Sequence, residues 1–114
     1  MGAFNELELP ESEVCPNCQL VIRRGVQFKY GNLEQRQYTL GDTLQWGLGR
    51  ERGEPGHRRV VVAGYIEPCP ICGHSPDTIY DIYVEDDVLR DVKESKQEYD
   101  YVFDYPDGFA ILEP

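Results

Sequence analysis

The chain has 114 residues, a formal net charge of −10 at pH 7, 11 glycines, 8 prolines and 8 tyrosines. This length is typical of one domain with a modest core, and the frequent glycine, proline and tyrosine favour short strands and turns over long helices. No apolar run approaches the roughly 20 residues of a membrane-spanning helix, and the first residues lack the basic and apolar regions of a signal peptide. We therefore expect a cytoplasmic protein without membrane association, in which paired cysteines act as metal ligands or redox centres rather than disulfides.

The negative charge is concentrated toward the C-terminus. Residues 1–74 hold nine acidic and eight basic residues, for a net charge of −1, whereas residues 75–114 hold twelve acidic and three basic residues, for −9. Such a field repels phosphate backbones, which disfavours nucleic acid as a partner. A protein partner that meets the C-terminal face should be basic or neutral.

The N-terminal segment, residues 1–13, mixes apolar residues with four glutamates, which fits either a flexible lead or an edge strand. Residues 14–114 are expected to form a single β domain that contains all four cysteines. Near its start, Val26, Phe28 and Tyr30 alternate with polar residues, as in a half-buried strand.

Residues 47–59 are rich in glycine and charge, and this composition predicts a mobile surface loop. Four arginines, Arg50, Arg52, Arg58 and Arg59, give this segment a positive charge opposite in sign to the C-terminal third. They are candidates for contact with an acidic group of a partner. The simpler interpretation is that they are solvated or offset the charge of a nearby anionic site.

Two further segments have clear apolar patterns. Residues 60–66 (Val-Val-Val-Ala-Gly-Tyr-Ile) form the strongest buried-strand pattern and lead directly into the second cysteine pair. Residues 79–93 predict a hairpin that turns at Asp86-Asp87. The alternative is a short helix over residues 86–97, with acidic residues in its first turn and lysines in its last.

In residues 99–105, aromatic side chains alternate with mostly acidic ones. The period of two predicts a strand with one aromatic face. As an exposed edge, this strand would offer Tyr99, Asp100, Tyr101 and Asp104 to a basic partner. As an ordinary sheet strand, it would only have a solvated acidic face.

The four cysteines form two identical motifs, Cys15-Pro-Asn-Cys18 and Cys69-Pro-Ile-Cys72. A Cys-x-x-Cys turn presents two sulfur ligands to one side of a metal ion, and a second such turn completes a tetrahedral shell. Proline after the first cysteine fixes the backbone where the turn bends. The sequence therefore predicts one metal ion bound by all four cysteines.

These turns resemble the knuckles of zinc ribbons and rubredoxins, which pair two Cys-Pro-x-Cys-Gly turns at the ends of short hairpins. The resemblance covers residues 15–19 and 69–73 and implies a structural zinc ion, with iron as the alternative. Fifty residues separate Cys18 from Cys69, more than in a compact ribbon, so a sheet must be inserted between the knuckles. The expected fold is mainly β, a twisted antiparallel sheet or partly open barrel whose ends a zinc ribbon joins.

The combined features favour a small zinc-binding protein that acts as a non-catalytic protein-interaction module. The two histidines suggest no catalytic arrangement with serine and aspartate, so an enzyme is the less favoured class. Rubredoxin-like electron transfer or Cys-x-x-Cys thiol chemistry is the alternative, and a nucleic-acid-binding zinc ribbon is a further one.

Overall fold

The computed structural model describes residues 3–114, and within this range the chain forms eleven strands and no helix. In chain order the strands are β1 (Asn5–Glu8), β2 (Glu13–Val14), β3 (Val21–Ile22), β4 (Gly25–Phe28), β5 (Gly31–Asn32), β6 (Gln37–Tyr38), β7 (Glu51–Arg52), β8 (Arg59–Ile66), β9 (Ile79–Glu85), β10 (Val88–Glu94) and β11 (Phe109–Glu113). The described chain therefore has no helix with the length and apolar character to cross a membrane. The expected mainly β class is confirmed.

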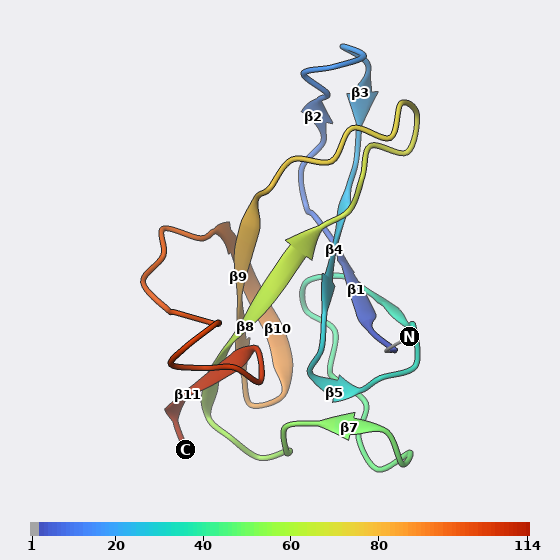
Figure 1. Ribbon diagram of the computed structural model, residues 1–114. Helices are drawn as coiled ribbons and strands as arrows, with labels where there is room; N and C mark the ends of the chain where they lie inside the picture. The colour runs from blue at the N-terminus through green and yellow to red at the C-terminus, as the bar shows by residue number, and fades with distance from the viewer. Residues whose placement is uncertain (1–2) are drawn as a thin grey trace.

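The main sheet has the order β10-β9-β8-β4-β1-β6, and β11 also pairs with β8. Strands β4 and β11 pair with opposite ends of β8 on one side, and β9 pairs with its other side, so β8 joins three strands of the sheet. The sheet twists and curls around its core as a half-barrel (Figure 1). It is mixed rather than purely antiparallel, because β1 and β6 run parallel.

The main core fills the concave side of this sheet. Its largest fully buried members come from segments far apart in sequence and include Leu7, Phe28, Tyr30, Ile82 and Leu89. Apolar residues on successive strands therefore meet on one face, as their period-two spacing predicts. Trp46 packs at the margin of this core, with its ring 5.3 Å from that of Tyr30.

Strand β8 is buried on both faces. Val60 and Val62 belong to the main core, and Val61 and Ala63 point to the opposite side of the strand, yet all four are almost completely buried. The chain between β10 and β11, residues 95–108, runs over this outer face (Figure 1). This cover explains why β8 reads as a continuous apolar run rather than an alternating one.

Strands β9 and β10 confirm the predicted hairpin and exclude the alternative helix over residues 86–97. Asp86 and Asp87 form its turn with φ angles of 50° and 64°. Aspartate tolerates this left-handed conformation better than most residues, and such turns match the twist of the flanking strands. The two strands cover residues 79–85 and 88–94, close to the predicted range of 79–93.

The predicted strand over residues 99–105 is wrong. The Asp100 side chain accepts hydrogen bonds from the backbone N–H groups of Val102 and Phe103, each at 2.9 Å. The Asp100 carbonyl also accepts the N–H group of Tyr105 at 2.9 Å. These bonds fold the segment into turns and prevent the extended backbone that alternation alone suggests.

Residues 1–13 were expected to form a flexible lead or an edge strand; residues 1–2 lie outside the described part, and within it strand β1 is an inner strand. It lies between β4 and β6 in the main sheet. Asn5 is fully buried, and its side-chain amide donates hydrogen bonds to the carbonyls of Tyr30 and Asn32 at 3.2 and 2.9 Å. Its side-chain oxygen accepts the N–H groups of Glu34 and Arg36, so one side chain fixes the crossover that makes β1 and β6 parallel.

The segment over residues 47–59 is not loop throughout. Its β7 residues pair with β5 in a separate two-stranded sheet. The Tyr30 hydroxyl donates a hydrogen bond to the Glu54 carbonyl at 3.2 Å. The segment is therefore attached to the core at two points.

Candidate metal centre

Both cysteine pairs lie at one end of an elongated molecule that measures 42 Å along its longest axis and 28 Å across. The first pair belongs to the β2–β3 hairpin, and the second lies in the connection from β8 to β9 (Figure 1). Figure 1 shows these two segments side by side, beyond the ends of β4 and β8. We call this region, residues 13–22 and 67–75, the cysteine tip.

The two cysteine turns have the same backbone hydrogen bonds. In each, the N–H group of the first cysteine bonds to the carbonyl five residues later, at 3.0 Å from Cys15 and 2.8 Å from Cys69. The carbonyl of that cysteine accepts the N–H group four residues later, from Gln19 at 2.8 Å and from Gly73 at 2.9 Å. Gln19 and Gly73 both have positive φ angles, 61° and 78°. The left-handed backbone is thus a property of the turn, and glutamine adopts it despite a cost of about 1–2 kcal/mol.

The four sulfur atoms come together in one cluster. All lie within 4.8 Å of one another, with Cys15 Sγ 3.7 Å from Cys72 Sγ and Cys18 Sγ 3.9 Å from Cys69 Sγ. A tetrahedral site with metal–sulfur bonds of about 2.3 Å requires sulfur separations of about 3.8 Å. Disulfides would need about 2.0 Å, and all four cysteines are free thiols. The cluster therefore has the dimensions of a tetrathiolate metal site.

The cluster is partly enclosed. Cys15 and Cys69 are buried and pack with Ile22, Cys18 is half-buried, and Cys72 is exposed. No cysteine lines the cavities of about 670 Å³ and 220 Å³ that lie elsewhere on the described chain. A metal ion bound by all four sulfurs would have a complete tetrahedral shell, as in structural zinc sites.

Backbone and amide groups around the sulfurs favour thiolates at two positions. The backbone N–H of Cys18 bonds to the Cys15 sulfur and, with that of Asn17, lowers the pKa of Cys15 to about 6 against the effect of burial. The Asn17 side chain and the His74 backbone lower the pKa of Cys72. At Cys18, the Leu20 N–H also favours the thiolate, but burial and the neighbouring sulfurs outweigh it and raise the pKa to about 11. Cys15 and Cys72 therefore favour the thiolate form and Cys18 favours the thiol form. All four sulfurs would be thiolates together only with a cation bound among them.

A buried arginine lies against the cluster. The Arg24 side chain is only 1% exposed, and its Nη2 lies 3.8 Å from Cys15 Sγ. Its Nε lies 3.3 Å from Glu13 Oε1. A buried guanidinium is costly unless it has anionic partners; Glu13 supplies one, and a thiolate at Cys15 would supply a second.

Sequence reasoning missed Arg24, although a signal was present. Ile22, Arg24, Val26 and Phe28 are spaced by two and are all buried. The period-two pattern of strand β4, extended backward, places Arg24 on the inward face. An arginine at an inward position indicates a buried anion nearby.

The structure separates the four candidate arginines. Arg50 and Arg58 are exposed beside β7 and β8, and Arg52 lies in β7. Arg59 forms ion pairs with Glu85 at 3.6 Å and with Glu113 at 3.1 Å. Its charge is therefore offset within the chain.

The C-terminal candidates come together in part. The ring of Tyr99 lies 6.3 Å from that of Tyr101 and 6.5 Å from that of Tyr105. Asp100 and Asp104 are exposed on the same turns, and the Asp104 N–H donates to the Asp100 carbonyl at 3.1 Å. An aromatic cluster with acidic neighbours therefore forms without the predicted strand.

A comparison of the chain with protein-family models, with curated proteins and with solved structures found no match.

Proposed function

We propose that the chain is a small structural-zinc protein and a non-catalytic protein-interaction module. The observation that supports the metal is the sulfur cluster: all four sulfurs lie within 4.8 Å of one another, and two of the separations, 3.7 and 3.9 Å, match the roughly 3.8 Å of a tetrahedral tetrathiolate site. Zinc is favoured because closed sites with four thiolates are a usual form of structural zinc. Iron, which prefers the same geometry, is the alternative metal.

The charge balance supports a bound divalent ion. Four thiolates and one divalent ion leave a net charge of −2, which Arg24 partly offsets from within 3.8 Å of Cys15. Without a metal, protonated thiols would give the buried guanidinium weaker partners. The residues around the sulfurs thus suit an occupied site.

The metal would stabilise the cysteine tip rather than the main sheet. The apolar cluster at the tip contains Ile22 and cysteines, whereas the main core contains buried residues from six strands and connecting segments but no cysteine among those described. The pairing of β4 with β8 brings the bases of the two turns together, but a cluster this small contributes little free energy to hold the turns themselves against each other. Metal binding supplies the free energy that fixes them.

The interaction role is supported by apolar side chains exposed around the metal site. Val14 and Val21 are neighbours on paired strands and are 61% and 69% exposed, and Leu20 and Ile71 on the two knuckles are 49% and 58% exposed. Exposed apolar residues gathered at one end of a small domain are typical of contact surfaces. Because the net charge is −10, a protein partner fits better than nucleic acid.

The test is elemental analysis of protein purified without added metal, together with its visible spectrum. One zinc per chain, and no reaction of the thiols with a chromogenic reagent until a chelator is added, would support the proposal. A red protein with one iron per chain would favour electron transfer instead. Four thiols that react freely in folded, metal-free protein would refute a structural metal site.

A further inference from the structure

A groove lies on the outer face of the main sheet, away from the metal site. Residues 95–108 cover this face beside Asp81, whose buried carboxylate accepts a hydrogen bond from the Tyr101 hydroxyl at 2.7 Å. The cover ends before Tyr65 and Ile79, which pair across β8 and β9 and remain 52% and 40% exposed. A cavity of about 670 Å³ lies between these two residues and the covering segment. This volume is within the size range of ligand sites.

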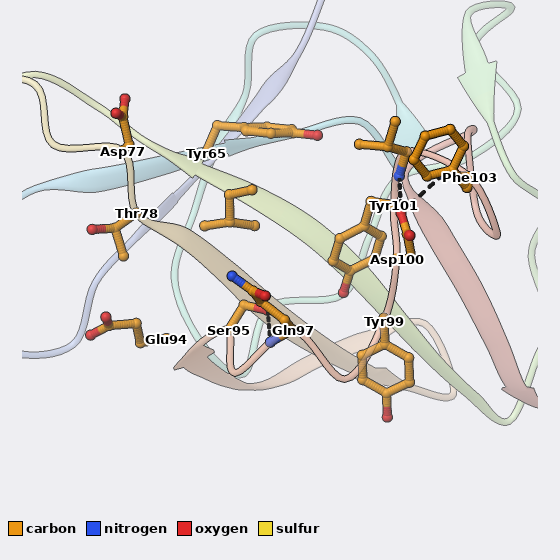
Figure 2. A pocket seen from close by; sticks show the side chains of 12 residues that line it. Tyr65, Asp77, Thr78, Glu94, Ser95, Gln97, Tyr99, Asp100, Tyr101 and Phe103 are labelled. Atoms are coloured by element: carbon orange, nitrogen blue, oxygen red, sulfur yellow. Dashed lines mark hydrogen bonds between the residues drawn. The ribbon is translucent and has the colours of Figure 1, made fainter.

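Aromatic side chains form much of the groove. Tyr65 lies along one side, and Tyr99, Tyr101 and Phe103 project from the covering segment (Figure 2). At the rim, Val102 and Phe103 are 73% and 82% exposed. The groove therefore offers ring faces inside and apolar side chains at its edge.

The charged residues of the groove are all acidic. Asp77, Glu94 and Asp100 line it, and no lysine or arginine does (Figure 2). None of these three carboxylates forms an ion pair within residues 3–114. Lys93 precedes Glu94 on β10, and its Nζ lies 3.5 Å from Asp91 Oδ2 and 5.8 Å from the centre of the Tyr83 ring. The groove thus has three uncompensated negative charges beside exposed aromatic rings.

Lys96 stands between Ser95 and Gln97 in the covering segment but does not itself line the groove. Two other basic residues line a separate cavity. Lys29 and Arg52 line a smaller space of about 220 Å³, which shares Tyr65 and Tyr101 with the groove. These two tyrosines lie at the boundary between an acidic side and a basic side. An anionic ligand such as phosphate would be repelled from the groove.

We propose that this groove binds an arginine- or lysine-bearing segment of a partner protein. A guanidinium or ammonium group gains from ring faces and from carboxylates together. The exposed Val102 and Phe103 at the rim favour a peptide over a free cation, because neighbouring residues of a chain can cover them. This inference names a partner class for the proposed interaction role and does not depend on which metal is bound.

The groove is preorganised for such a ligand. The Tyr101–Asp81 hydrogen bond fixes the covering segment on the sheet. Asp100 uses Oδ1 to hold the turn through Val102 and Phe103, which leaves Oδ2 for a ligand. Rings that are already positioned lose little conformational freedom on binding.

The experiment uses the full metal-loaded chain and a fluorescein-labelled Gly-Ser peptide with arginine at every third position. The same peptide with citrulline removes the charge and keeps the shape. Fluorescence anisotropy gives the affinities, and backbone amide shifts in NMR spectra locate the site. The Glu94→Gln and Tyr65→Leu variants change the groove, and Glu11→Gln removes one exposed acid outside it as the matched control.

We expect the arginine peptide to shift amides at residues 65, 79 and 99–103, and the citrulline peptide to bind at least about tenfold more weakly. Glu94→Gln and Tyr65→Leu should each weaken binding several-fold, whereas Glu11→Gln should not. Equal weakening by Glu94→Gln and Glu11→Gln would show a general charge effect and overturn the proposal. So would equal affinity for free arginine methyl ester, which would mean a small-molecule site. Absence of binding to a chain with one metal ion would overturn the groove proposal and leave the metal proposal intact.

Discussion

Replacing Arg24 by glutamine tests whether the sulfur cluster is anionic and metal-bound. The guanidinium lies 3.8 Å from Cys15 Sγ. At an effective dielectric constant of about 20, a unit charge pair at this separation interacts by about 4 kcal/mol. The measured loss should be smaller, because water can enter the vacated space and because Arg24 also stabilises a thiolate in the metal-free protein.

We therefore expect Arg24→Gln to weaken metal binding about 10- to 100-fold, or by about 1.4 to 2.8 kcal/mol. Competition with a chromophoric zinc chelator at neutral pH measures this difference. Arg23→Gln is the matched control, since Arg23 forms a half-exposed ion pair with Glu8 at 3.4 Å that contributes less than about 1 kcal/mol. Arg24→Lys keeps the charge and should retain most of the affinity.

Equal metal affinities for Arg24→Gln, Arg23→Gln and the unmodified chain would refute the reasoning. Far-ultraviolet circular dichroism checks that the main sheet remains folded in each variant. If Arg24→Lys loses as much affinity as Arg24→Gln, packing or hydrogen-bond geometry rather than charge makes Arg24 necessary.

Three other perturbations probe the fold around the site. Asn5→Ala leaves the backbone groups bonded to Asn5 without partners, and urea unfolding should show that the free energy of unfolding falls by about 2–4 kcal/mol. The control Gln37→Ala, at an exposed position, should lower it by almost nothing. A similarly small loss in both variants would contradict the role of Asn5. Burial and the nearby Glu6 raise the pKa of Glu67, so its ionised form is disfavoured in the folded state and stability should fall as pH rises through that pKa. Glu67→Gln should accordingly raise the melting temperature at pH 7 and not at pH 3, and a lower melting temperature at pH 7 would contradict this sign. Chelation should speed amide exchange in residues 13–22 and 67–75 while β8 and β9 stay protected, and loss of protection throughout β8 would show that the tip and the sheet unfold as one unit.

Local signals in the sequence predicted much of the fold and the grouping of the cysteines. The hairpin at Asp86-Asp87 followed from turn residues between two apolar runs, and the buried β8 strand followed from its uninterrupted valines. The two Cys-Pro-x-Cys turns are likewise local, because each is held by hydrogen bonds within six residues. Features set by a few neighbouring residues are the ones that a sequence pattern can predict.

The remaining features depend on contacts between distant residues. The turns at residues 99–105 are anchored by the hydrogen bond from Tyr101 to Asp81, twenty residues away. The alternation of side chains in the sequence does not indicate that bond. Arg24 is buried between Glu13 and the Cys15 sulfur, and that sulfur belongs to a cluster completed by cysteines more than fifty residues away. The parallel pairing of β1 with β6 depends on Asn5 bonding to four backbone groups 25 to 31 residues later.

The connection from β8 to β9 links the two candidate sites. Its base is the paired Tyr65 and Ile79, which line the groove, and its far end is the second cysteine turn. The sheet fixes this connection at one end, and a metal ion would fix it at the other, so Asp77 and Thr78 on the groove wall lie between two anchored points. Loss of the metal would free the far end and increase the conformational freedom that a ligand must remove on binding. In the proposed function, a structural metal ion would therefore contribute to recognition at a groove that it does not touch.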